Sequence, residues 1–434
     1  MGLPSGSGSE SRLAAYVEAL TGALGHADRA APFRSYCTGL LLPGARKSVE
    51  PMAARVEPLR VQAVHQSLHH FVAKADWSED ALLAAVRARV LPVMQQQGAV
   101  RGWVVDDTGI PKKGKHSVGV ARQYCGQLGK QDNCQVAVTL SLASDHASLP
   151  IAHRLYLPQA WADDPARRTR AGVPDDVVFQ TKPQIALAQI RAAYAAGVPP
   201  ATVLADAGYG VDTALRDGIA ELGLAYVIGI QSHTSLWPPG MQPLPPKPWS
   251  GRGRPPSLVR RNAEHAPMPA KDLAASLPQR AWRRVTWREG SNAALASRFA
   301  AVRVRPAHRD YNRTGPRPEE WLLIEWPKGE KEPTKYWLST LPAATSLRAL
   351  VEQAKLRWRI ERDYQDLKQE LGLGHYEGRG WRGFHHHAAL CIAAYGFLIA
   401  ERAALPPTDE FWPPSLQKPA LPTAFRPRGA PDPA

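Results

Sequence analysis

The 434-residue chain is poor in cysteine, in acidic residues and in long apolar runs. Its four cysteines form no C-x-x-C pair, which excludes a disulfide-stapled scaffold and argues against a structural zinc site. The longest apolar run, residues 388–400, is shorter than the roughly 20 residues of a membrane-spanning helix. The Gly- and Ser-rich residues 1–10 lack the basic and then apolar order of a signal peptide. We therefore expect a cytoplasmic protein that makes no membrane contact.

Basic residues are in clear excess over acidic ones. The chain has 54 Lys and Arg against 39 Asp and Glu, a formal net charge of +15. Such a charge favours nucleic acid as the partner because binding releases counterions, although a basic composition can also serve solubility. Hydrophobic residues make up 44% of the chain, which is ordinary for globular proteins and excludes a wholly disordered or fibrous chain.

Changes in apolar periodicity and in proline content divide the chain into five segments. They are a helical N-terminal DNA-binding region (1–97), a first core part (98–230), a β-rich insertion with a Pro-rich basic linker (231–345), C-terminal core helices (346–404) and a Pro-rich disordered tail (405–434). The linker carries eight prolines between residues 237 and 256, so regular structure is not expected there.

The core part has the pattern of an α/β fold. Apolar runs predict a first strand at 103–105 that ends at Asp106, followed by strands at 134–143 and 149–157. A helix at 183–196, a strand at 201–206, a helix at 211–222 and a strand at 225–230 complete the core. Three strands and then helix–strand–helix–strand is the order of an RNase H-like mixed sheet. Two further helices, at 346–371 and 387–403, follow the insertion.

Three acidic residues occur where this core would bring them together. Asp106 ends the first strand, Asp206 ends the fourth, and Glu361 lies on the helix after the insertion. Ligands of open α/β sheets collect at the carboxyl ends of the strands. Three carboxylates there repel one another unless cations neutralise them, and hard oxygen ligands favour Mg²⁺, for which Mn²⁺ can substitute. Two such ions can hold both the attacking and the leaving oxygen of a phosphodiester.

Asp107 is the alternative to Asp106. Neighbouring strand residues point to opposite faces, so only one of the two can be a ligand. We favour Asp106, which takes the first place of an Asp-x-Thr strand end, and expect Asp107 to cap a turn. Asp206 alone could equally be a solvent-facing turn residue, and the charges around Glu361 could form an ordinary salt-bridged helix face.

Several cations could contact DNA phosphates. Arg357 and Lys368 flank Glu361 at helical spacing, which would place all three on one face of a helix. The basic loop Lys112, Lys113 and Lys115 follows the first aspartate and could grip phosphates, the alternative being a solvated loop.

Two shorter strings have weaker functional meaning. Arg252 and Arg254 lie in Gly-Arg-Gly-Arg-Pro, which looks like the extended minor-groove-binding core of an AT-hook but also arises by chance in a Pro-rich linker. Consecutive histidines at 385–387 point in different directions on a helix and cannot share one metal ion. We expect them at a helix start, partly facing DNA or the core.

Three strings of the chain resemble the DDE transposases of bacterial insertion sequences: residues 104–130, 203–210 and 356–379. They look like the group that has a β-rich insertion before the Glu and the motif Tyr-x2-Arg-x3-Glu-x6-Lys around it. Arg357, Glu361 and Lys368 match this motif, whereas the Tyr position holds Ala354.

This resemblance implies a two-metal transposase that cleaves phosphodiester bonds at transposon ends and transfers the freed 3′-OH strand into target DNA. Asp106, Asp206 and Glu361 would be its catalytic metal ligands. It also implies a homodimer on double-stranded DNA and a nucleoid-associated bacterial protein. A domesticated endonuclease without strand transfer and a non-catalytic DNA-binding regulator are the alternative functions.

Overall fold

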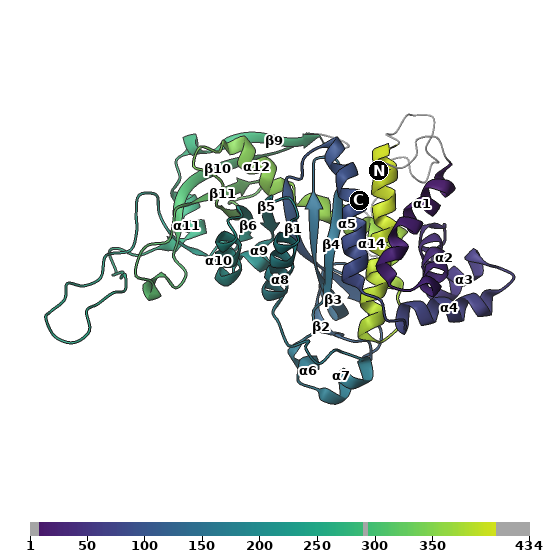
Figure 1. Ribbon diagram of the computed structural model, residues 1–434. Coiled ribbons are helices and arrows are strands. Elements are labelled where there is room, and N and C mark those ends of the chain that lie inside the picture. Colours follow the sequence, from purple (N-terminus) through teal and green to yellow (C-terminus); the bar gives the residue numbers. More distant parts are fainter. Residues whose placement is uncertain (1–7, 290–293, 405–434) are drawn as a thin grey trace, which may run out of the picture.

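A computed structural model describes residues 8–289 and 294–404, so the predicted tail 405–434 lies outside the described residues. The predicted N-terminal helical region is confirmed (Figure 1). Ser78 caps the longest of its helices by accepting a hydrogen bond from the backbone N–H of Ala81. The helices of this region are α1 (Ser9–Thr21), α2 (Ala30–Leu41), α3 (Val49–Val56), α4 (Val61–Ala73) and α5 (Glu79–Gln97).

A long C-terminal helix, α14 (Trp381–Ala404), joins the helical region to the rest of the protein. It lies beside α5 (Figure 1) and its most apolar window is 94% buried. Among the described residues it is the one helix whose length and composition would allow a membrane span, and this degree of burial is typical of a core helix.

The three consecutive histidines lie within α14, which begins six residues before the predicted start. Of the two expected surroundings, DNA or the core, the structure shows the core, because all three are buried. His386 stacks on Trp77 with ring centroids 3.7 Å apart, and His387 contacts the hydroxyl of Tyr36 at 2.8 Å. Burial lowers the pKa of each of the three imidazoles to about 4, so they are neutral core residues at neutral pH.

A single mixed sheet forms the centre of the protein (Figure 1). Five strands lie in the order β4-β3-β1-β5-β6, antiparallel from β4 through β3 to β1 and parallel from β1 through β5 to β6. β2 pairs with the outer part of β3, and the sequence pattern does not predict it. The strands are β1 (Gly102–Pro111), β2 (Ala121–Cys125), β3 (Lys130–Ala143), β4 (Ser148–Leu155), β5 (Thr202–Ala205) and β6 (Tyr226–Ile230).

β1 does not end at Asp106 as predicted but continues to Pro111. The reason is its pairing: β3 runs antiparallel along all of β1, whereas parallel pairing with β5 stops at Val104. Asp107 is therefore a strand residue and does not cap a turn. Both aspartates lie just beyond the point where the parallel part of the sheet ends.

The β-rich segment after β6 continues the same sheet. β12 pairs antiparallel with β6, and β11, β10 and β7 follow outward. The Pro-rich stretch between β7 and β8 extends away from the body without regular structure, as expected (Figure 1). The elements are β7 (Ser235–Trp237), β8 (Met268–Pro269), α11 (Ala270–Ser276), β9 (Arg283–Glu289), β10 (Ala294–Pro306), β11 (Glu320–Trp326) and β12 (Lys335–Ser339).

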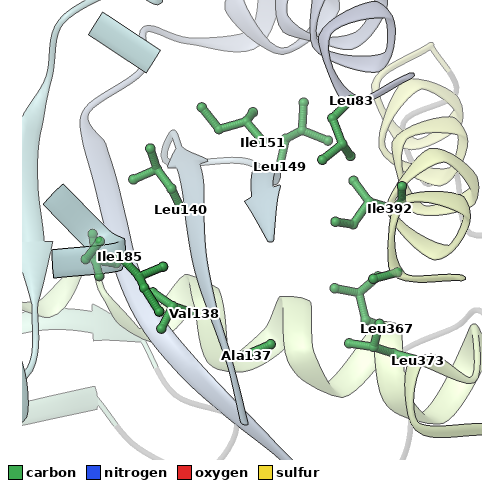
Figure 2. Packing of buried hydrophobic residues seen from close by; sticks show 14 of the residues in the cluster. Leu83, Ala137, Val138, Leu140, Leu149, Ile151, Ile185, Leu367, Leu373 and Ile392 are labelled. Atoms are coloured by element: carbon green, nitrogen blue, oxygen red, sulfur yellow. The ribbon is translucent and has the colours of Figure 1, made fainter. Parts of the chain in front are cut away.

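Helices cover both faces of the sheet. One face packs α8 (Lys182–Ala195), α5 and α14 against strands β3 and β4, with Ile185, Leu83 and Ile392 in one apolar cluster (Figure 2). On this side α10 (Thr213–Glu221) packs against α8. The other face packs α12 (Leu347–Lys355) and α13 (Trp358–Gln365) on a second cluster that contains Val104 and Leu204.

The predicted helix 346–371 is not continuous. Between α12 and α13 the N–H groups of Arg359 and Ile360 bond to carbonyls three residues back, the tighter pattern of a 3₁₀ turn. A π-helical turn, Asp366–Glu370, follows α13. Apolar periodicity persists across both irregularities, so the sequence pattern alone does not reveal them.

Candidate active site

Asp106 faces the helices α12 and α13. Side chains alternate along a strand, so Asp106 shares a face with Val104, which packs in the cluster under these helices. Its Oδ2 accepts a 2.7 Å bond from Nη1 of Arg357, and its side chain is 14% exposed. Burial raises the pKa of Asp106 to about 7; Arg357 lowers it, and the nearby Asp206 raises it.

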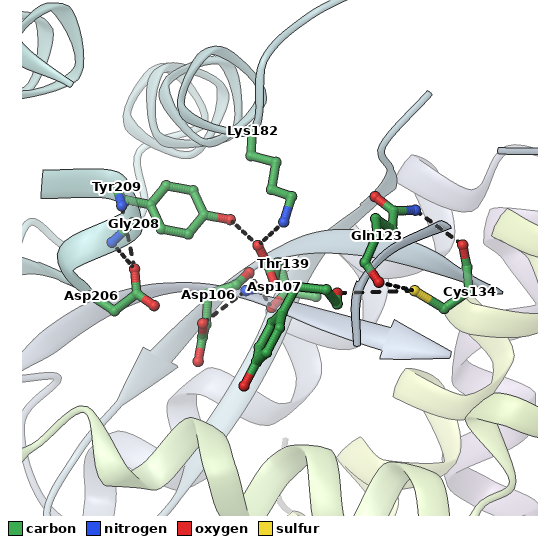
Figure 3. Close-up of polar contacts among 10 residues, drawn as sticks. Asp106, Asp107, Gln123, Cys134, Thr139, Lys182, Asp206, Gly208 and Tyr209 are labelled. Atoms are coloured by element: carbon green, nitrogen blue, oxygen red, sulfur yellow. Dashed lines mark hydrogen bonds and ion pairs between the residues drawn. The ribbon is translucent and has the colours of Figure 1, made fainter. Parts of the chain in front are cut away.

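Asp107 points to the opposite side of the sheet, toward Lys182 at the start of α8 (Figure 3). Its Oδ2 lies 2.7 Å from the Lys182 ammonium and accepts a 3.5 Å hydrogen bond from the Tyr209 hydroxyl. The two neighbouring aspartates therefore have different partners. No sequence motif around Lys182 predicts its ion pair with Asp107.

Asp206 directly follows β5 and begins the short helix α9 (Ala207–Gly210). Its Oδ1 accepts hydrogen bonds from the N–H groups of Gly208 at 2.8 Å and Tyr209 at 3.3 Å (Figure 3). Two glycines allow this turn to lie directly on β6. A Cβ on Gly229 would meet the nitrogen of Ala207 at 2.8 Å, and one on Gly210 would meet the carbonyl of Gly229 at 1.7 Å.

Parallel pairing brings Asp106 and Asp206 to the same place. Val104 is the register partner of Leu204, so the residues two positions further on each strand leave the paired region together and on the same face. The structure therefore places these two aspartates beside each other on neighbouring strands.

Glu361 lies on α13, on the helical side that Asp106 faces. Its Oε1 is 3.3 Å from Nη2 of Arg357, whose other nitrogen bonds Asp106. Arg357 thus bridges two of the three predicted carboxylates. Glu361 is 66% exposed, so solvent and ligands can reach it. Within residues 8–289 and 294–404, no three Asp, Glu, His or Cys groups lie close enough together to hold a metal ion.

Lys368 lies in the π-helical turn that directly follows α13, so the regular α-helical spacing predicted between Glu361 and Lys368 does not hold. Its Nζ donates a 2.9 Å hydrogen bond to the carbonyl of Gly109 on β1. Burial lowers the pKa of this ammonium. Lys368 therefore links its helical segment to β1.

A cavity of about 480 Å³ opens beside the carboxylates. Asp206, Arg357 and Glu361 line one side of it, and residues of the β-rich segment line the other. Ala354, at the position where the resembling transposases have Tyr, is also part of the wall. Aromatic side chains near this position come instead from elsewhere in the chain: Trp287, Tyr336, Trp337 and Trp358.

The basic residues predicted to contact DNA differ in their exposure and in their hydrogen bonds. Lys113 and Lys115 are exposed, whereas the Lys112 ammonium donates a 2.7 Å hydrogen bond to the carbonyl of Tyr376. Arg252 and Arg254 are exposed on the segment that extends from the body. Their backbone is not extended as predicted, because the glycines at 251 and 253 have φ values of +83° and +73° and bend the chain.

Comparison with known proteins gives a family and one curated relative. Residues 19–294 match the DDE superfamily endonuclease family, a range that includes Asp106 and Asp206 and ends before Glu361. The chain is also 32% identical, over 169 residues, to a protein of Microchaete diplosiphon described as a probable transposase for insertion sequence element IS701. This similarity covers 39% of the chain and 41% of that relative. Because the family match spans more than half of its residues, the chain belongs to the DDE superfamily of endonucleases.

Proposed function

We propose that the protein is a DNA transposase that cleaves phosphodiester bonds at transposon ends and joins the freed 3′-OH strand to target DNA. The observation that carries this proposal is the juxtaposition of Asp106 and Asp206 on neighbouring parallel strands, on the face covered by α13, which carries Glu361. Membership of an endonuclease family and similarity to a transposase support it. The strand order β4-β3-β1-β5-β6 and its pairing directions support an RNase H-like core.

Asp106, Asp206 and Glu361 are the residues that would hold two divalent cations, Mg²⁺ with Mn²⁺ as a substitute. The chemistry of these side chains fits, because all three are hard oxygen ligands without a competing soft ligand among them. In the metal-free arrangement of the described residues the three carboxylates lie too far apart to share an ion, so binding would have to draw them together. Once bound, the metal pair supplies charge neutralisation for the attacking and leaving oxygens of the phosphodiester.

Arg357 would set the charge of the site when no cation is bound. Its guanidinium lies between Asp106 and Glu361 and offsets the repulsion that two close carboxylates would otherwise suffer. With metal ions on these carboxylates, the same guanidinium would be free to contact a phosphate of the bound strand. Lys368 would act by positioning, because its contact with Gly109 ties the helical segment to the strand that carries Asp106.

DNA outside the reacting bond would contact the basic surfaces. Lys112, Lys113 and Lys115 follow the carboxylate strand, and Arg252 and Arg254 lie on an exposed extension. Phosphate contacts of this kind give affinity and orientation but little sequence discrimination. We also propose that two protomers bind two transposon ends as a homodimer, and that the protein is a cytoplasmic, nucleoid-associated bacterial protein.

A cleavage and joining assay tests the proposal. Duplexes carrying the terminal sequences that flank the gene are incubated with Mg²⁺ and a target plasmid. We expect nicked ends and joined products from the wild type. Asp206→Asn and Glu361→Gln should make neither product while binding DNA within a few-fold of wild type, because the basic surfaces remain.

Each other outcome contradicts a stated part of the proposal. Cleavage without joined products would favour an endonuclease, and binding without cleavage would favour a regulator. Near-wild-type nicking by Asp206→Asn or Glu361→Gln would refute the site assignment. Light scattering that finds only one protomer per DNA under conditions of cleavage would refute the dimer.

A further inference from the structure

A second cavity, of about 490 Å³, lies at the far end of β1 from the parallel pairing. Three segments that are distant in the sequence line it: the connection between α2 and α3, the loop after β1, and the segment that precedes α14. Each contributes cations to its wall or rim, namely Arg46, Lys112 with Lys113, and Arg379. Their convergence is not visible in any sequence motif.

Hydrogen bonds from backbone and side-chain groups hold the three segments together. The N–H of Lys47 donates to Nδ1 of His375 at 3.0 Å, and the N–H of Val118 donates to the carbonyl of Arg379 at 3.0 Å. The Lys112 ammonium bonds the carbonyl of Tyr376 across the cavity wall. These bonds fix the backbone on all sides, so a ligand would meet a largely preformed site and lose little affinity to ordering it.

The charge of the cavity favours an anion. Arg46, Lys113 and Arg379 are exposed, and Lys112 adds a fourth cation in the wall. Glu377 is the acidic residue of the lining, and it pairs with Arg46. Burial lowers the pKa of Lys112, which is the expected effect for an ammonium that has lost part of its water. Added negative charge at the cavity mouth would offset the mutual repulsion of these cations.

We propose that this cavity binds a backbone phosphate of the DNA duplex whose reacting bond lies at the carboxylates, an inference that rests on the proposed DNA substrate. Asp106 and Lys112 are six residues apart on one extended segment, which is roughly 20 Å. That length equals about six base-pair steps of B-form DNA. A duplex that crosses the protein surface in the direction of β1 would therefore contact the cavity a little over half a turn from the reacting bond, and two contacts at this spacing would set its register.

The salt dependence of DNA binding tests this assignment. The probe is a long labelled duplex of arbitrary sequence, in buffer without divalent cations so that cleavage plays no part. Each lost phosphate contact lowers the slope of log K against log salt by about 0.9. The double variant Lys113→Ala/Arg379→Ala should lower the slope by about two and weaken binding more at low salt than at high salt. Among the described residues, neither side chain makes a hydrogen bond like that of Lys112. Thermal melting verifies that the variant is folded.

Arg191→Ala provides the matched control. Arg191 is an exposed arginine on α8 whose ion pair with Glu221 is 3.5 Å long and solvent-exposed, so its removal changes the net charge without touching the cavity. Its slope should equal that of the wild type. A folded double variant with the wild-type slope would overturn the proposal. The proposal would also be overturned if the double variant had a reduced salt slope with an RNA duplex but not with a DNA duplex.

This test is independent of the proposed catalytic function. Glu361→Gln should lose cleavage and keep the full salt slope, whereas Lys113→Ala/Arg379→Ala should lose slope in the absence of any reaction. If neither the wild type nor any variant cleaves DNA but the cavity variant still has a reduced salt slope, the proposed transposase function fails and the proposed phosphate site stands. If the wild type cleaves DNA and the cavity variant keeps the wild-type salt slope, only the phosphate site is refuted.

Discussion

Replacing Asp106 with asparagine should remove activity and yet make the metal-free protein more stable at neutral and alkaline pH. Burial raises the pKa of this carboxyl from its ordinary value of 3.8 to about 7. Between those two values the folded carboxyl keeps its proton while the unfolded one has lost it, so stability falls as pH rises through the interval. At about 1.4 kcal/mol per pH unit, the loss of folding free energy reaches roughly 4 to 5 kcal/mol above pH 7.

The amide of the Asp106→Asn variant does not titrate, so this variant should escape the loss. Relative to wild type, its melting temperature should rise by about 5 °C between pH 4 and pH 8, given the unfolding entropy of a chain of this size. Mg²⁺ provides a second measurement that does not depend on activity. It should raise the melting temperature of the wild type, whose Asp106 would be a ligand, by more than that of the variant.

Asp363→Asn is the matched control. Burial also raises the pKa of Asp363 to about 7. This residue follows Glu361 by two positions on α13, so it points to another side of the helix, where it accepts hydrogen bonds from Ser148 and Tyr395. Its variant should show a similar pH effect with the full response to Mg²⁺. If the difference in melting temperature between Asp106→Asn and the wild type were the same at pH 4 and pH 8, burial would not be the cause of the raised pKa. An undiminished Mg²⁺ response in that variant would refute the ligand role.

Three further outcomes are expected. Asp107→Asn should keep cleavage within about tenfold, because Asp107 faces Lys182 on the other side of the sheet; loss of cleavage in this variant alone would reverse the assignment of the two aspartates. Arg357→Ala should shift the pH at which cleavage sets in to higher values, because Arg357 lowers the pKa of Asp106; an unchanged pH–rate profile would contradict this. Glu325→Gln should destabilise the protein by about 3 kcal/mol in chemical unfolding, because Glu325 is 5% exposed and pairs with the Lys355 ammonium at 2.6 Å; a change below about 0.5 kcal/mol would show that the pair is effectively solvated.

Local sequence patterns determined most of the elements of this protein. The helical N-terminal region, the cap at Ser78, the core strands apart from β2 and the irregular Pro-rich stretch follow from periodicity, capping and proline chemistry. These features depend on residues within a few positions of one another. The same patterns placed acidic residues at the predicted ends of two strands and on a later helix, and a resemblance to a transposase family indicated what they could do.

Tertiary structure decided which of these residues meet. Because side chains alternate along a strand, the sequence shows that Asp106 and Asp107 face opposite sides of the sheet. Only the pairing of β1 with β5 and the packing of α13 determine that Asp106 is the one on the side of Glu361. Long-range pairing also carried β1 past the aspartates, joined β12 to β6, and buried the histidines of α14. The basic cavity likewise joins segments more than 300 residues apart in the chain, such as those of Lys47 and His375. Such contacts depend on the summed energy of many distant partners, and therefore no short stretch of sequence contains them.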